Sequence, residues 1–166
     1  LIECEIQDKK IGVYHLGFII GPCINASGRL DNAKKGVRLL LCEDEKEAVT
    51  LAKDLVKLNE ERKSMTMNGV EDAIEIVENS DMKNNKVFVI YLPHIHESLA
   101  GIIAGRIREK YNVPTLILTK SESGAKGSGR SIEEYNMFEE LVKCKDLLDK
   151  FGGHPMAAGF SLKEEN

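Results

Sequence analysis

Two segments near the end of the chain combine glycines with basic side chains, and the first is GAKGSGRS at residues 124–131. Glycine allows backbone N–H groups to approach an anion without obstruction by a side chain. An arginine such as Arg130 clamps a phosphate or carboxylate through two parallel hydrogen bonds, and Lys126, Ser128 and Ser131 add a further cation and two hydroxyl groups. The segment therefore predicts a cradle for phosphate or carboxylate, although a flexible hairpin whose glycines serve only turn geometry has the same composition.

The second segment, FGGHPMAAG at 151–159, places His154 among glycines and other small residues. Two further basic residues are candidates for function: His96 follows an apolar segment and precedes a helical one, and Arg29 follows a turn in GPCINASGRL. Each also has a structural alternative. His154 is compatible with a loop between a helix cap and a strand, His96 with an ordinary structural histidine, and Arg29 with a helix-capping segment.

The overall composition limits the classes of protein to which the chain can belong. Its 166 residues include 23 Lys and Arg against 27 Asp and Glu, a net charge of −4, so any polyanion site must be a local patch. The chain is long enough to bury a hydrophobic core. The four cysteines form no CxxC pair and no Cys/His cluster with metal spacing, which indicates reduced thiols and no structural zinc.

The sequence contains no signal peptide, and no apolar stretch approaches the roughly 18 residues that a membrane helix needs. We therefore expect a cytoplasmic protein without a membrane partner. The chain begins at Leu1 and not at a methionine. This start indicates a piece of a longer protein, although removal of a tag would leave the same start.

A long helix is predicted between residues 44 and 80. Its apolar residues recur at helical spacings of three, four or seven positions with charged residues between them: Ala48, Leu51, Leu55, Leu58 and Met65. Roughly 36 residues would span about 54 Å, more than the core of so small a domain requires, so the helix is expected to connect two bodies. Asn68-Gly69 interrupts the pattern and predicts a kink or a break.

The remaining residues alternate between strand and helix patterns. Residues 86–92 and 114–119 are typical of buried strands, and the helical segment 98–112 between them predicts a strand–helix–strand crossover. Within that helix, Gly101 and Gly105 allow close approach to a neighbouring element. The later elements expected are a strand through 124–131, a helix over 136–150 with a cap at Asn136 and an end at Gly152, and a strand over 157–162.

In their order along the chain, GPCINASGRL, the long charged helix, HESLAGIIAGRI, GAKGSGRS and FGGHPMAAG resemble the C-terminal part of RecJ. RecJ is a family of bacterial single-strand-specific 5′→3′ DNA exonucleases in the DHH phosphoesterase superfamily. The resemblance extends from about residue 10 to 166, and the INA-x-GR segment and the long helix are its most specific parts. One departure is YLPHIH at 91–96, where RecJ sequences often have Trp or Gly before the histidine.

The resemblance implies an α/β fold in which a long connecting helix precedes a small DHH-associated domain with a mixed sheet flanked by helices. Residues 1–42 would be the C-terminal remnant of the DHH catalytic domain, 43–80 the connecting helix, and 81–166 the DHH-associated substrate-binding domain. In the family, Mn²⁺ or Mg²⁺ held by Asp and His of the first domain activates water for attack on a phosphodiester. This chain has no DHH triplet and no Asp-x-Asp pair, so the metal is expected in the missing domain and none in this chain.

The implied function of this chain is to hold the substrate of a metal-dependent exodeoxyribonuclease. By motif match, Arg29, Ser128 and Arg130 would grip the terminal phosphate and the adjacent backbone. The complete candidate set, which includes the glycine-rich cradle and the residues expected to face the cleft, is Arg29, His96, Lys126, Ser128, Gly129, Arg130, Ser131, Gly152, Gly153 and His154. The implied partners are single-stranded DNA, the protein's own DHH domain and a single-stranded-DNA-binding protein.

Two other functions fit the same residues: the matching part of a DHH phosphodiesterase for short oligonucleotides or cyclic dinucleotides, and a stand-alone nucleotide-binding or scaffolding module. Phosphate contacts contain no base information, so binding is expected to be independent of sequence and sensitive to salt. No aromatic pair is spaced for base stacking, which predicts weak binding of single strands by this chain alone. The aromatic residues expected in the core instead are Tyr91, Tyr111, Tyr135 and Phe138.

We predict that the 166-residue chain alone does not hydrolyse DNA at any Mn²⁺ concentration, because its sequence lacks the motifs that bind the metal. A nuclease assay on a contaminant-free preparation, with and without a chelator, measures this. Cleavage that EDTA abolishes would place an active site within this chain and contradict the prediction.

Overall fold

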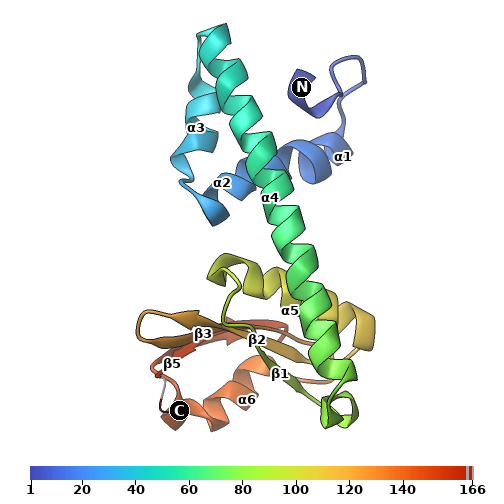
Figure 1. The fold of residues 1–166 in the computed structure, drawn as a ribbon, viewed down its shortest axis with the longest axis vertical. Helices are drawn as coiled ribbons and strands as arrows, with labels where there is room; N and C mark the ends of the chain where they lie inside the picture. The colour runs from blue at the N-terminus through green and yellow to red at the C-terminus, as the bar shows by residue number, and fades with distance from the viewer. Residues whose placement is uncertain (164, 166) are drawn as a thin grey trace. The chain divides into compact units, whose positions relative to one another are not determined.

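The computed structural model describes residues 1–163 and 165, which form two compact units that divide between Ser64 and Met65. Helix α4 (Glu45–Glu78) is a single helix of 34 residues that contributes to both units (Figure 1). This helix confirms the one predicted over 44–80. The three-part division of the chain at residues 42 and 80 stays a prediction.

The break expected at Asn68-Gly69 is wrong, because α4 continues through these residues. Gly69 is required instead for packing within the second unit. A Cβ built on Gly69 would lie 2.6 Å from Ile103 Cδ1 and 3.0 Å from Ile95 Cδ1. The glycine therefore allows α4 to approach the apolar side chains of the following helix, which offsets its low helix propensity.

The first unit consists of helices joined by short loops. Besides the first part of α4, its elements are η1 (Ile2–Cys4), α1 (Val13–His15), the π-helical turn η2 (Leu16–Ile20), α2 (Gly21–Leu30) and α3 (Lys34–Leu41). Its buried apolar side chains include Ile6, Cys23, Ala26, Leu51 and Leu55. The unit thus has a small core for its length.

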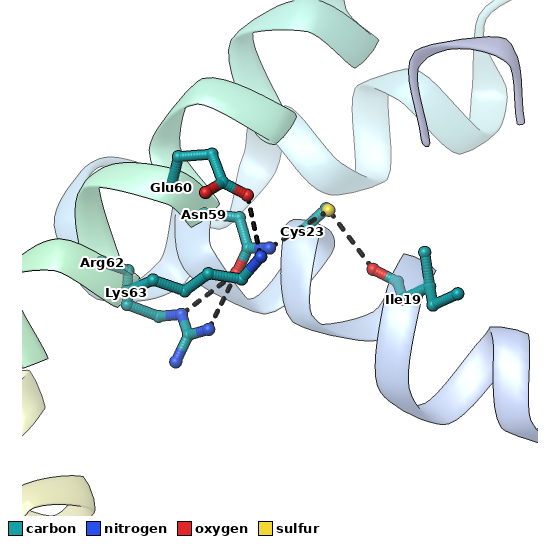
Figure 2. Close-up of polar contacts among 6 residues, drawn as sticks. All are labelled: Ile19, Cys23, Asn59, Glu60, Arg62 and Lys63. Carbon is teal, nitrogen blue, oxygen red and sulfur yellow. Dashed lines mark hydrogen bonds and ion pairs between the residues drawn. The ribbon is translucent and has the colours of Figure 1, made fainter. Parts of the chain in front are cut away.

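A buried polar contact joins α2 to α4 within the first unit (Figure 2). The Asn59 amide donates a hydrogen bond to Cys23 Sγ (3.5 Å), and the Cys23 thiol donates to the Ile19 carbonyl oxygen (3.3 Å). Burial raises the pKa of Cys23 to about 11, so the thiol keeps its proton at neutral pH. Arg62 donates two hydrogen bonds to Asn59 Oδ1 (3.1 and 3.0 Å). This network fixes α2, the helix that contains Arg29, against α4.

The second unit is a mixed sheet with helices on both faces, as predicted. Its five strands have the order β1-β2-β3-β5-β4, and only β1 and β2 are parallel to each other among the paired strands described. The elements are η3 (Asp81–Asn84), β1 (Phe88–Tyr91), α5 (Glu97–Tyr111), β2 (Thr115–Ser121), β3 (Gly124–Arg130), α6 (Met137–Lys143, capped as expected by Asn136), η4 (Lys145–Leu147), β4 (Lys150–His154) and β5 (Ala157–Leu162).

Side chains alternate along the strands and give the sheet two faces, which Figure 1 shows covered by different helices. On the α5 face, the sheet packs against α5 and the second half of α4 through Phe88, Ile90, Ile117, Leu99, Ile103, Ile107, Ala73 and Val77. On the α6 face, the buried cluster is Leu116, Ala158, Phe160, Met137 and Leu141. The α5 and α6 faces are named in this sense below.

The helix predicted over 136–150 is shorter than expected, because α6 ends at Lys143. Gly152 lies within β4 and not at a helix end, which contradicts the prediction. Phe151 of β4 pairs in register with Phe160 of β5 and packs against the cluster on the α6 face. Burial of this aromatic side chain in the sheet therefore outweighs the local helical pattern.

Two glycines of the sheet provide a matched test of this packing. A Cβ built on Gly127 would overlap the Phe160 ring, whereas no described atom lies within 4 Å of one built on Gly152. We expect Gly127→Ala to lower the free energy of unfolding by about 1–3 kcal/mol, and Gly152→Ala to change it by less than about 0.5 kcal/mol. Chemical denaturation followed by circular dichroism measures both, and equal losses would contradict the packing.

Candidate phosphate-binding face

Strand β3 contains most of the segment GAKGSGRS and is paired on both sides. It pairs with β2 along one edge and with β5 along the other. Its backbone N–H groups therefore take part in the sheet, and the predicted cradle of free N–H groups is wrong. Contacts from β3 to a ligand must come from its side chains.

The polar side chains of β3 lie on one face of the sheet. Lys126, Ser128 and Arg130 occupy alternate positions and share the α5 face. The candidate Gly129 points to the α6 face, where a Cβ would lie 3.0 Å from Met137 Sδ. The strand thus presents its hydrogen-bond donors on one side and packs closely on the other.

The register of β3, β5 and β4 extends the α5 face into an open floor. Three rows of residues cross these strands: Lys126–Ser161–Lys150, Ser128–Gly159–Gly152 and Arg130–Ala157–His154. Gly152 and Gly159 are exposed. The nearest described atom to a Cβ on Gly159 lies 3.9 Å away, and none lies within 4 Å of a Cβ on Gly152. A ligand beside Ser128 can therefore approach the bare backbone of the sheet.

Lys150, Gly159 and Ser161 belong to this floor but were not predicted from the sequence. A signal for two of them was present. The segment AAGFSL alternates small side chains with apolar ones, so Gly159 and Ser161 must share the face opposite to Phe160. Lys150 could not be found this way, because its strand was predicted as the end of a helix.

Arg130 is oriented by contacts with its own strand and with α5. Its Nη1 donates hydrogen bonds to the Gly129 carbonyl oxygen (2.7 Å) and to Ser128 Oγ (3.2 Å). A Cβ on Gly101 of α5 would lie 2.7 Å from Arg130 Nη2, and one on Gly105 would lie 4.0 Å from Arg130 Cγ. This confirms the close approach of α5 to a neighbouring element. The partly buried guanidinium loses little further freedom when it binds an anion.

His154 lies at the tip of the β4–β5 hairpin, in the same row as Arg130. Its position contradicts the loop expected between a helix cap and a strand. His154 Nδ1 accepts a hydrogen bond from the Met156 N–H (3.3 Å). Because an amide N–H can only donate, Nδ1 is unprotonated and Nε2 has the ring proton. The exposed imidazole thus offers an N–H donor at the edge of the floor.

Ser131 and Gly153 lie away from this floor. Ser131 is 1% exposed, and its hydroxyl donates to the Tyr135 carbonyl oxygen (2.5 Å). Gly153 points to the other face, where a Cβ would overlap the Ala157 carbonyl oxygen. Both residues therefore have structural roles, one in the turn after β3 and the other in the hairpin.

The last candidates lie outside the three rows or at their margin. His96 is the N-cap of α5, and its Nδ1 accepts from the Ser98 N–H (3.3 Å). Lys126 forms an ion pair with Glu97 (2.6 Å). Arg29 belongs to α2 in the first unit. A shared site for Arg29 and the residues of the sheet therefore stays a prediction.

Aromatic side chains are more exposed than predicted. Tyr91 of β1 is 51% exposed, although it was expected in the core. In the first unit, exposed Tyr14 and Phe18 stack with ring centroids 5.3 Å apart. This pair was not predicted, because the helical turn that contains it was not recognised. The spacing of four residues is the signal that could have found it.

Within residues 1–163 and 165, no group of three His, Cys, Asp or Glu side chains is arranged to hold a metal ion. The described donors thus do not fit a catalytic divalent cation. In the same part of the chain, no helix is both long and apolar enough to cross a membrane.

The chain is similar to known proteins over nearly all of its length. The family model described as the DHHA1 domain matches residues 84–166. The single-stranded-DNA-specific exonuclease RecJ of Bacillus subtilis is 40% identical over 153 residues, which cover 91% of this chain and 19% of that relative. The chain thus spans about a fifth of the length of this curated relative.

Solved RecJ structures have the same fold. The crystal structure of RecJ in complex with Mg²⁺ from Thermus thermophilus matches with a TM-score of 0.86 and 32% identity, over 99% of this chain and 25% of that chain. The crystal structure of the exonuclease RecJ bound to manganese matches with a TM-score of 0.83 and 32% identity, over 99% of this chain and 40% of that chain. These matches confirm the predicted fold class.

We predict that Gly101→Ala weakens binding of a 5′-phosphorylated nucleotide, because the new methyl group would displace the Arg130 guanidinium and the Ser128 hydroxyl. The loss should be roughly tenfold, similar to removal of a hydrogen bond to a charged group. Gly105→Ala is the matched control, since its methyl group makes only an ordinary contact with Arg130 and alanine favours the helix. Titration followed by NMR compares the variants, and equal affinities would contradict this position of Arg130.

Proposed function

The chain belongs to the DHHA1 domain family, and on this premise we propose that it is the substrate-binding part of a RecJ-type 5′→3′ single-stranded-DNA exonuclease. The observation that most supports this role is the bare glycine floor beside an oriented arginine. Such a surface suits the phosphate at the end of a strand, because it offers charge, directed donors and close approach to the sheet. Hydrolysis of DNA is proposed for the whole protein and not for this chain.

In this proposal, Ser128 and Arg130 bind the terminal phosphate above Gly152 and Gly159. The guanidinium supplies charge and paired donors. Ser128 Oγ accepts a hydrogen bond from Arg130, so the hydroxyl proton of Ser128 can be donated to a phosphate oxygen. His154 Nε2–H, at the end of the Arg130 row, supplies a further donor. Terminal-phosphate contacts of this kind position a strand without selecting its sequence.

The metal chemistry is proposed to belong to a part of the protein outside this chain. The solved relatives hold Mg²⁺ or Mn²⁺, whereas the described residues of this chain offer no donor set that fits such an ion. A bound divalent ion supplies an activated water and stabilises the phosphoryl oxygens. The contribution of this chain is positional: the grip on the terminal phosphate determines which phosphodiester reaches the metal.

Residues 1–42 of the first unit are proposed to be the C-terminal remnant of the DHH catalytic domain and to pack against its metal-bearing part. This segment exposes several large apolar side chains: Val13, Tyr14, Phe18, Leu40 and Leu41. Large apolar side chains that gather on a surface commonly contact another protein, so these residues are proposed as contacts with the rest of the DHH domain. Arg29 lies on α2 of the same unit and is proposed to add a second arginine to the phosphate site.

We further propose a cytoplasmic location, which the free cysteines support. A single-stranded-DNA-binding protein is proposed as a partner of the whole enzyme.

The proposal is tested by titrating the chain with a 5′-phosphorylated single strand of about ten nucleotides, its 5′-hydroxyl twin and a cyclic dinucleotide. We expect the 5′-phosphate to be preferred by roughly tenfold, because it adds negative charge and free oxygens at the site of Arg130. Arg130→Ala should abolish the preference. Arg130→Lys should restore only part of it, because lysine retains the charge but lacks the paired donors.

Lys143→Ala is the matched control, because it removes a cation from α6 on the opposite face of the sheet. This variant should keep the full preference for the 5′-phosphate. Equal binding of the 5′-phosphate and 5′-hydroxyl strands by the wild type would contradict the terminal-phosphate grip. Stronger binding of the cyclic dinucleotide would instead favour a phosphodiesterase for short nucleotides.

A further inference from the structure

A second group of basic side chains lies at the other end of β3 from Arg130. A hollow of about 710 Å³ opens between the loop before α5 and the β2–β3 hairpin, and its lining includes His96, Lys120 and Lys126 together with the carboxylates Glu97 and Glu122. Lys126 lies on the same face of β3 as Arg130. A strand that begins at Arg130 and follows β3 would therefore reach this hollow.

His96 is held in one tautomer by its role as a helix cap. Its Nδ1 accepts a hydrogen bond from the Ser98 N–H (3.3 Å) and lies 2.8 Å from Ser98 Oγ. Since the amide can only donate, Nδ1 is unprotonated and Nε2 has the ring proton. His96 thus offers an N–H donor at the hollow, with its orientation set by α5 before any ligand binds.

Lys126 has a carboxylate partner that a ligand has to replace. Its ammonium group forms an ion pair with Glu97 (2.6 Å), and both side chains are about half exposed. An exposed pair of this kind contributes little stability in water. A phosphate group competes with the carboxylate for the same ammonium, so Glu97 reduces the affinity of Lys126 for an anion.

Lys126 and Arg130 are suited to different phosphates of one strand. They are four residues apart on β3, which separates their Cα atoms by roughly 13 Å. Their side chains also contact different turns of α5, with Lys126 at Glu97 and Arg130 at Gly101. The backbone of one nucleotide contains about half as many bonds as that of four amino-acid residues, so successive phosphates of a strand lie closer together than the Cα atoms of Lys126 and Arg130. Lys126 would therefore meet a phosphate beyond the terminal one.

We propose that His96 and Lys126 form a second phosphate subsite for an internal phosphate of the single strand, and that Glu97 weakens this subsite by competing for Lys126. The inference rests on the proposed function, because it takes a strand held at Arg130 as the ligand. It limits tight binding to substrates long enough to extend from Arg130 to Lys126.

The test compares 5′-phosphorylated single strands from a mononucleotide to about six nucleotides in length, on the wild-type chain and three variants. His96→Asn keeps a good N-cap side chain but removes the Nε2–H donor. Lys126→Gln removes the cation, and Glu97→Gln removes the competing charge. The measured quantity is the gain in affinity between the mononucleotide and the longest strand.

We expect His96→Asn and Lys126→Gln each to reduce this gain by roughly fivefold and Glu97→Gln to increase it by a similar factor. All three variants should bind the mononucleotide as the wild type does. Lys126→Gln should also reduce the salt dependence of binding by about one phosphate contact. Lys143→Gln, on the opposite face of the sheet, is the matched control and should change neither quantity.

Two results would overturn the subsite. If His96→Asn and Lys126→Gln weakened mononucleotide binding as much as binding of the longest strand, both residues would belong to the terminal-phosphate grip. If none of the three variants changed the gain with length, the hollow would not bind the strand. Failure of the proposed function looks different: 5′-phosphate and 5′-hydroxyl strands would bind alike, while the gain with length would still respond to Glu97→Gln.

Discussion

The candidate face depends on how closely α5 packs on β3. Gly101 leaves the space in which the Arg130 guanidinium lies, and on the other face Gly127 leaves the space for the Phe160 ring. Because β3 has little bulk of its own, it is covered tightly on one side and still presents Ser128 beside the helix on the other. The position of the hydrogen-bond donors therefore depends on the glycines, which leave space for neighbouring side chains, as much as on the polar residues themselves.

Much of the fold could be predicted because its patterns are long and regular. Helix α4 and the crossover from β1 through α5 to β2 follow from apolar periodicities that local sequence fixes. The end of α6 and the existence of β4 could not be predicted, because they depend on the pairing of Phe151 with Phe160 of β5, which local sequence does not indicate. Gly69 was misjudged for a related reason, since its small size serves contacts with a helix distant in sequence.

The candidate site was predicted in its residue types but not in its geometry. Ser128, Arg130 and His154 do share one face, but the backbone of their segment is used by the sheet and forms no cradle. Gly129 and Gly153 looked equal to these residues in the sequence, yet the alternation of a paired strand turns them to the opposite face. Strand pairing is a long-range property, and a single glycine-rich motif does not report it.

The pairing of β3 with β5 also links ligand binding to folding. The β2–β3 and β4–β5 hairpins join neighbouring residues, whereas β3 and β5 are separated by roughly 30 residues of chain, so their pairing requires closure of a much longer loop. Local hairpins form within microseconds, and long-range pairing is slower. We therefore expect the rows that end at Lys150 and His154 to assemble late. A ligand that contacts both β3 and β5 would stabilise the pairing of these two strands and protect the folded sheet from local opening.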